Sequence, residues 1–399
     1  MKIRTRLLIL LLLVALSPLV AVSLVDHVST HRLGRYLAGQ AREVLIQNAR
    51  LHLHEIVRGY GGVLDRDKRL LEFALRTQAR EIERRLREGP PPSPQIFFSR
   101  DYDSPTNSPP MTLSTKHFRQ NSQGQLNPIP VTYEEQVYFV VAGVDPQAIA
   151  DDLACLSTMP KVYKDLYQSD PEMMYWQYTA LESGFHSSYP GHGGYPDDYD
   201  PRVRKWYLDA KQADSLVWIP PMPDVSTRTV PLALAMPVRR PDGSFAGVTA
   251  IDVPLNKIFK ELQLPENLRD QAKTMVVRLT QIGPTAGKAL GVAFQKSYDK
   301  RVADWRAQIE LEYLESSDQE QLAALMSEAL AGISGVRQMP YKGRDSLWAY
   351  GAAETPTQPF PMVIVPRGYL LDSTSHYLLW LTNKWNGTGS TCTACCARR

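Results

Sequence analysis

The chain has 399 residues, enough for two or three domains, and a formal net charge of only +3. So small a positive charge gives no basis for a nucleic-acid partner, and 43% hydrophobic with 22% charged residues is typical of a folded globular protein. Three of the four cysteines lie in the last eight residues, which excludes a disulfide framework across the fold. Cys155 is therefore predicted to be a buried free thiol.

The N-terminus combines positive charge with a long apolar run. Residues 1–6 contain three basic side chains, and residues 7–25 are apolar. At ~1.5 Å per residue, this run just crosses a hydrocarbon core of ~30 Å. The charges predict a cytoplasmic N-terminus, a single transmembrane anchor in the inner membrane, and a periplasmic location for the bulk of the chain. The alternative is a signal peptide cleaved after residues 21–23, but the run continues without a break into a helical pattern, which favours the anchor.

Residues 26–88 have the pattern of one or two long stalk helices. Apolar residues recur at helical spacing, and charged residues fill the other faces. Gly59, Gly61 and Gly62 predict a kink, and Gly89 with the three prolines after it predicts the helix end. A long helix that leaves a membrane is expected to pair with a second copy, which predicts a homodimer.

The following part, residues 89–255, is predicted to form an α+β module. Residues 93–130 are rich in Ser, Pro, Asn and Gln and predict an irregular surface segment, and a helix is expected at about 146–166. Local hairpins among the predicted strands, with helices between them, favour an antiparallel sheet covered by helices on one side. The predicted strands are 137–141, 174–181, 185–189, 217–219, 230–238 and 245–253.

A second, smaller module is predicted at residues 256–366. It is expected to contain a strand at 274–279, a mostly helical region at 298–330, a hairpin over 336–353 and a last strand at 360–365. Because both modules end in a hairpin and a closing apolar strand, a weak internal repeat is predicted. Residues 367–399 have only short apolar pieces, too interrupted to cross a membrane, and are expected to be an irregular tail left by a truncation or a frame change.

The stretch from Tyr189 to Tyr207 is the most informative part of the chain. A glycine-rich loop at 189–195 leaves a strand and runs into a short helix, for which Asp200 is a suitable N-cap and Pro201 a suitable first residue. Arg204 and Tyr207 are predicted to share a face of this helix, with Trp206 as an adjoining wall. A guanidinium beside aromatic rings suits a carboxylate, so this stretch is interpreted as the floor of a small-ligand pocket.

Taken together, these features resemble the double-Cache (dCache) extracellular sensor domain of bacterial transmembrane receptors, over residues 7–366. The resemblance is carried by Tyr189-Pro190-Gly191, by Asp200-Pro201-Arg202 with Arg204 and Trp206-Tyr207, and by Asp242-Gly243, Gly247-Val248 and Ile251-Asp252-Val253. It implies a long N-terminal helix followed by two PAS-like (Cache) antiparallel-sheet modules in tandem. It also implies ligand sensing for transmembrane signal transduction, with the ligand in the first, membrane-distal module and with neither catalysis nor a cofactor.

One subgroup of that family binds amino acids, and this chain is similar to it at several positions. The resemblance implies a ligand site made of Tyr199, Arg204, Trp206, Tyr207, Asp224 and Asp252, with Met222 where the family has a tyrosine. The chemistry agrees, because a guanidinium can hold a carboxylate and two carboxylates can hold an ammonium. Aromatic rings beside that cation contribute ~0.5–2 kcal/mol.

Each of these residues also has a purely structural interpretation. Arg204 could pair with Asp200 as an ion pair. Trp206 and Tyr207 could belong to the core, and Tyr199 could lie on the surface. Asp224 could be a loop acid, and Asp252 could cap a helix that begins near residue 254. On these interpretations the chain is a dimerisation module with a vestigial pocket. A third interpretation, a metal-dependent hydrolase using His186, His192, Asp197 and Asp198, matches no known ligand spacing, so neither a metal nor an enzyme is expected.

Overall fold

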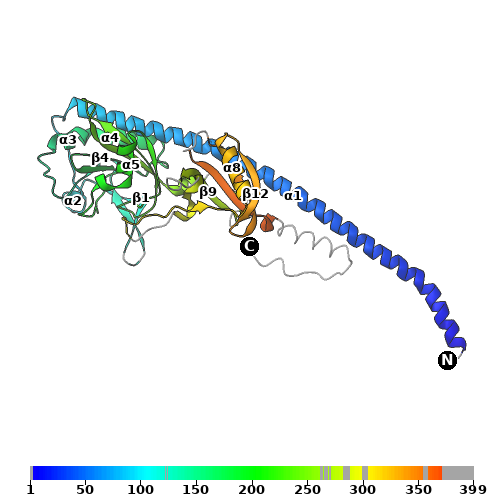
Figure 1. Ribbon diagram of the computed structural model, residues 1–399. Coiled ribbons are helices and arrows are strands. Elements are labelled where there is room, and N and C mark those ends of the chain that lie inside the picture. The colour runs from blue at the N-terminus through cyan, green and yellow to red at the C-terminus, as the bar shows by residue number, and fades with distance from the viewer. Residues whose placement is uncertain are drawn as a thin grey trace.

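The fold is built on one helix that runs most of the length of the molecule (Figure 1). The computed structural model describes residues 3–121, 123, 125–260, 264, 268, 271–281, 288–298, 304–353 and 358–370. Helix α1 (Ile3–Glu88) has 86 residues, and two sheet units lie one after the other along its C-terminal half. Most side chains of the predicted anchor, residues 7–25, lie outside the described residues. Within the described part of the chain, no helix combines the length and the apolarity that a membrane span requires.

The C-terminal half of α1 belongs to the hydrophobic core of both units. Leu53, Val57 and Leu75 are fully buried at helical spacing, in one cluster with strands from both sheets. The helix continues unbroken through residues 59–62, so the glycines there do not divide it in two. It ends as predicted at Gly89, whose φ of +81° lets its N–H donate to the carbonyl of Arg85.

The first sheet has six antiparallel strands in the order β3-β5-β4-β8-β7-β6. These strands are β3 (Val137–Val140), β4 (Trp176–Leu181), β5 (Phe185–Tyr189), β6 (Val217–Ile219), β7 (Leu232–Arg239) and β8 (Phe245–Val253). Because successive side chains of a strand point to opposite faces, each strand serves two environments. One face packs on α1, where the amide of Gln78 donates to Thr249 Oγ1 at 2.6 Å and to the carbonyl of Ala250 at 3.1 Å. The other face forms the floor of a cavity.

Short helices and a separate hairpin surround this sheet. The helices are α2 (Ser99–Tyr102), α3 (Ala150–Cys155), η1 (Leu156–Thr158), α4 (Met159–Ser169), η2 (Pro201–Val203) and α5 (Lys205–Ala213), and Cys155 is a buried free thiol as predicted. The prediction that residues 93–130 are irregular is wrong, because β1 (Thr112–Gln120) and β2 (Leu126–Val131) pair as a two-stranded sheet. The polar composition of this segment hides the strands, since few of their side chains enter a core.

The second sheet is also antiparallel, in the order β11-β10-β9-β14-β13-β12. Its strands are β9 (Lys273–Gln281), β10 (Lys288–Gln295), β11 (Tyr313–Leu314), β12 (Gly335–Tyr341), β13 (Arg344–Tyr350) and β14 (Phe360–Pro366), accompanied by α6 (Leu255–Lys260), η3 (Lys296–Tyr298) and α8 (Gln319–Leu330). The prediction of a mostly helical region at 298–330 is wrong before α8. There Leu314 belongs to β11 and pairs with Leu290 of β10, a strand that the sequence pattern missed.

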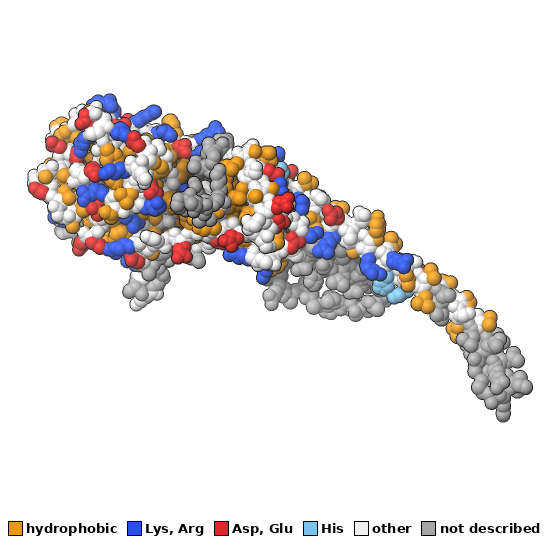
Figure 2. Space-filling view, in the orientation of Figure 1, with side chains coloured by type: hydrophobic (Ala, Val, Ile, Leu, Met, Phe, Trp, Pro, Cys, Tyr) orange, Lys and Arg blue, Asp and Glu red, His pale blue; other side chains and the backbone are white. Residues whose placement is uncertain are grey.

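The two sheets share one connectivity over five of their six strands. The pair β5-β4 lies beside β8-β7-β6 in the first sheet, just as β10-β9 lies beside β14-β13-β12 in the second. The predicted α+β fold, a long N-terminal helix followed by two antiparallel-sheet modules in tandem, is therefore confirmed, and so is the internal repeat. Acidic and basic side chains are interspersed over the broad end of the molecule seen in Figure 2, in keeping with the small net charge.

Candidate functional site

A small cavity lies on the face of the first sheet that is turned away from α1. Its lining includes six of the seven residues predicted to form a ligand site, Tyr199, Arg204, Trp206, Met222, Asp224 and Asp252. The predicted cation and both predicted anions therefore face one space. Tyr178 and His186 of the sheet complete its floor.

Tyr207 is the predicted site residue that the structure does not place in this lining. Its hydroxyl donates to Glu182 Oε2 at 2.6 Å, and its ring packs edge-on against Phe245 at a centroid distance of 5.9 Å. The reason is that Arg204 is not helical: with φ −77° and ψ 146° it is the residue before α5, so the shared-face argument does not apply. Trp206 and Tyr207 are consecutive on α5 and their side chains leave the helix about 100° apart, so only Trp206 reaches the cavity, although the two rings still touch at a centroid distance of 5.6 Å.

The turn before α5 positions Arg204. Asp200 caps η2 by accepting the backbone N–H of Arg202 at 2.9 Å, and it also pairs with the Arg202 guanidinium at 2.8 Å. The alternative pairing of Asp200 with Arg204 is therefore wrong. Arg204 instead donates from Nη2 to the carbonyl of Pro223 at 2.8 Å and from Nη1 to the carbonyl of Trp305 at 3.2 Å. A guanidinium has five N–H donors, so these two contacts leave donors for a ligand.

Asp252 is the deeply buried acid of the cavity, with 5% of its surface exposed. It lies near the end of β8, directly opposite Trp176 of β4, and its Oδ1 accepts the hydroxyl of Tyr178 at 2.8 Å. Burial first, and then the nearby charge of Asp224, raise the pKa of the Asp252 carboxyl well above its usual range. A cation bound between the two carboxylates would favour the charged form and so lower this pKa again.

Asp224 has a structural role as well as a place in the lining. Its Oδ2 accepts the backbone N–H of Thr227 at 2.6 Å, and its own N–H donates to the carbonyl of Thr229 at 2.8 Å, which closes the loop between β6 and β7. The interpretation of Asp224 as a loop acid and its interpretation as a site residue are therefore compatible, because one oxygen holds the loop while the residue lines the cavity.

Several lining residues were not predicted as ligand contacts. Trp176 and Tyr178 alternate on β4, and His186 and Ser188 alternate on β5, so the period of two that predicted the strands also puts each pair on the cavity face. From the sequence alone, His186 and His192 are considered only as metal ligands. His192 instead lies 2.8 Å from Ser226 Oγ and 3.0 Å from the carbonyl of Pro190. Among the described residues, no group of three or more His, Cys, Asp or Glu side chains could hold a metal ion.

A residue from the second sheet unit contacts two residues of the cavity lining. The ring of Trp305 lies edge-on to Tyr199 at a centroid distance of 5.7 Å and 5.0 Å from the Arg204 guanidinium, and Arg306 forms an ion pair with Asp198. The free volume of the cavity is about 30 Å³. This is room for about two or three water molecules, so an amino acid would fit only if the surrounding side chains moved.

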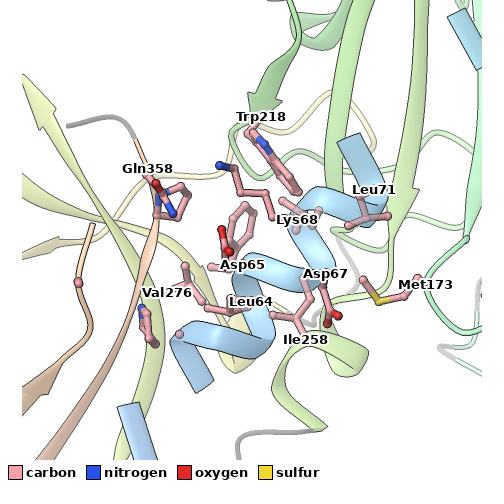
Figure 3. Close-up of a pocket in the computed structure, with 16 residues that line it drawn as sticks. Leu64, Asp65, Asp67, Lys68, Leu71, Met173, Trp218, Ile258, Val276 and Gln358 are labelled. Atoms are coloured by element: carbon pink, nitrogen blue, oxygen red, sulfur yellow. The ribbon is translucent and has the colours of Figure 1, made fainter. Parts of the chain in front are cut away.

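A second cavity of about 70 Å³ lies where α1 passes between the two sheets, as Figure 3 shows. Its walls are mostly apolar, with Leu64 and Leu71 of α1 facing Trp218 and Val276. The charged residues of its lining come from α1 and pair with neighbours on that helix; Asp65, for example, lies 2.7 Å from Arg69. The charges of this cavity are therefore satisfied within the helix, unlike those around Asp252.

Known proteins were compared with this chain by sequence family and by structure. No family model matches the chain. Similar solved structures include the ligand-binding domain of the Pseudomonas aeruginosa PAO1 amino acid chemoreceptor PctB in complex with L-Gln (16% identity, 56% of this chain and 83% of that chain, TM-score 0.34). Two antiparallel sheets that follow one another along a long N-terminal helix are the arrangement that the resemblance to the double-Cache domain predicted.

Two further similar structures are also ligand-binding domains. One is that of Mlp24 with asparagine (18% identity, 58% of this chain and 90% of that chain, TM-score 0.32). The other is that of the Pseudomonas fluorescens chemoreceptor CtaA in complex with L-isoleucine (16% identity, 54% and 79%, TM-score 0.32). Likeness at this level transfers neither a ligand nor a residue's role to this chain.

Proposed function

We propose that this chain is a double-Cache domain, the ligand-sensing part of a membrane receptor, and that its first module binds a small zwitterion, most simply an amino acid. The observation that carries the proposal is the placement of Arg204, Asp224 and Asp252 around one cavity lined by aromatic rings. The proposal is of binding without catalysis.

The charges of the cavity support a zwitterion because each is costly to bury alone. An ammonium between Asp224 and Asp252 would stabilise two carboxylates that repel each other, and the rings of Tyr199 and Trp206 would add cation–π attraction. The remaining N–H donors of Arg204 would hold a carboxylate at the other end. A ligand with both charges pairs every ion of the cavity, whereas a simple amine or a simple acid leaves one end unpaired.

The rest of the chain fits a receptor of this kind. In the proposal, residues 7–25 anchor the chain in the inner membrane, the modules face the periplasm, and α1 passes the change inward as part of a homodimer. Leu37, Val44 and Leu51 are more than half exposed on α1 and lie seven residues apart, which is the repeat of a coiled-coil seam. The shared core of α1 with both sheets supports the coupling.

Calorimetric titration of the full chain in detergent with the common amino acids tests the proposal. A bound ligand at ~100 times its dissociation constant should add ~2.7 kcal/mol to the free energy of unfolding. Arg204→Ala is expected to weaken binding at least tenfold, whereas Lys205→Ala, which removes the neighbouring cation that pairs with Asp209 outside the cavity, should leave binding unchanged. Equal affinity for both variants, or no binding by any amino acid, would refute the assignment.

The free volume of about 30 Å³ favours a second candidate, a dimerisation module whose pocket no longer binds a ligand. The same titration separates the two functions. On the second candidate no amino acid changes the stability of the full chain, while mutation of the exposed α1 seam still changes its oligomeric state.

A further inference from the structure

Two buried polar atoms of the cavity have no hydrogen-bond partner among the residues that the structure describes. They are Nε1 of Trp176 and Nδ1 of His186. Both residues line the cavity, and they are only 2% and 4% exposed. Buried polar groups in proteins are nearly always paired, so two orphans in one cavity indicate partners that a ligand supplies.

The indole of Trp176 is held so that it cannot find an acceptor elsewhere. Its ring lies between the imidazoles of His117 and His192, at centroid distances of 4.0 and 4.3 Å and interplanar angles of 31° and 27°. Both imidazoles are fixed in turn: His117 lies 2.8 Å from Ser114 Oγ and 2.9 Å from the carbonyl of Tyr175, and His192 is bonded through both ring nitrogens. The indole N–H is therefore a fixed donor without an acceptor.

His186 is the second fixed group. It stands on β5 among aromatic rings, with centroid distances of 5.6 Å to Tyr178, 5.6 Å to Tyr195 and 5.5 Å to Tyr199. Burial lowers the pKa of His186 to about 3, so the ring is neutral at neutral pH and offers one donor and one acceptor nitrogen. An alkyl group placed against it leaves Nδ1 unpaired in either tautomer.

We infer that Trp176 and His186 make the cavity specific for amino acids whose side chain carries a short, uncharged hydrogen-bonding group, a hydroxyl or a carboxamide. This inference rests on the proposed function. A hydroxyl or amide oxygen accepts the indole N–H, and the same group can donate or accept at His186. A side-chain carboxylate would face Asp224 and Asp252 with like charge, and a side-chain ammonium has no acceptor for the indole. The small volume selects the shorter members.

Matched ligand pairs on the unmodified chain test this selectivity without any mutation. Calorimetry compares serine with alanine, threonine with valine and asparagine with leucine, each pair differing mainly in the hydrogen-bonding atoms. The polar member is expected to bind at least ~100-fold more tightly, because a site built around buried polar groups rejects analogues that leave them unpaired, by up to ~10⁴-fold. If the apolar members bind equally well, the inference is overturned while amino-acid binding stands; if no amino acid binds, the proposed function itself fails.

Two variants assign the selectivity to these residues. Trp176→Phe keeps a ring between the imidazoles but removes the N–H, so the polar-to-apolar affinity ratio should fall at least tenfold with little loss of alanine binding. Trp218→Phe is the control, since its indole donates to Glu72 Oε1 at 3.0 Å outside this cavity, and it should leave the ratio unchanged. An unchanged ratio in Trp176→Phe, or an equal fall in Trp218→Phe, would contradict the role given to Trp176.

Discussion

Replacement of Asp252 by asparagine should change stability and binding in opposite directions. The carboxyl is 5% exposed and shares the cavity with Asp224, and both burial and that charge raise its pKa. A raised pKa means that the folded state binds more protons than the unfolded state. Stability contributed by this group is therefore present at low pH and is lost as pH rises above the unfolded value of ~3.9. Asparagine keeps the shape and an acceptor for Tyr178 and removes this penalty.

The magnitudes follow from the surroundings of the carboxylate. The free energy of unfolding without ligand should rise by ~1–3 kcal/mol at pH 7, the order of the desolvation penalty of a buried polar group, because asparagine carries no charge to bury beside Asp224. Binding of an ammonium should weaken by ~2–5 kcal/mol, or about 30-fold to a few thousand-fold, because one partner of a buried charge pair is gone.

Urea denaturation of the free chain and calorimetric titration with the bound amino acid measure the two effects. Asp209→Asn is the matched control, since this acid forms a partly exposed helical ion pair with Lys205 and should change stability by less than ~0.5 kcal/mol and binding not at all. A destabilised Asp252→Asn variant, or one that binds as well as the unmodified chain, would refute the assignment of Asp252 as the ammonium-binding group.

Three further predictions concern the scaffold. Gly191→Ala should destabilise the chain by ~1–3 kcal/mol, because a Cβ there would lie 2.3 Å from the Tyr102 hydroxyl, whereas Gly59→Ala, with nothing within 4 Å, should stabilise it by ~0.5–1 kcal/mol in urea denaturation. Val44→Asp should shift the full chain from dimer to monomer in analytical ultracentrifugation, and an unshifted mass would exclude the α1 seam. Burial lowers the pKa of His117, His186 and His192 to about 3. The free energy of unfolding should therefore fall as pH drops below ~6.5, by up to ~1.4 kcal/mol per pH unit for each of these histidines. Denaturation at a series of fixed pH values measures this fall.

The sequence predicted the strands well where burial is regular. Strands β5 and β8 have the expected boundaries because turns bracket them and nearly all their residues are buried. It failed where composition does not reveal the strand: the hairpin of β1 and β2 is polar and half-exposed, and β11 lies in the region 298–330 that was predicted to be mostly helical. No local pattern separates these strands from the irregular chain around them.

The candidate site was predictable to the extent that its residues follow one another in a motif. Six of the seven expected side chains line the cavity, and Tyr207 does not because Arg204 precedes the helix instead of belonging to it. Trp305 is 101 residues from Arg204 in sequence and belongs to the other sheet unit. The residues around the motif therefore give no signal that predicts this contact. Trp176 and His186 carried a usable signal, namely their even spacing from other cavity-facing residues on their strands.

The position of Trp305 has a practical consequence for work on fragments of this chain. A polypeptide that stops before residue 304 would lack Trp305. Its first module would therefore lose the ring contact of this indole with Tyr199 and one carbonyl acceptor of Arg204. Ligand affinities measured on such a fragment would describe a site that lacks these two contacts. In the intact chain, Tyr199 and Arg204 join the lining of the cavity directly to a residue of the second module.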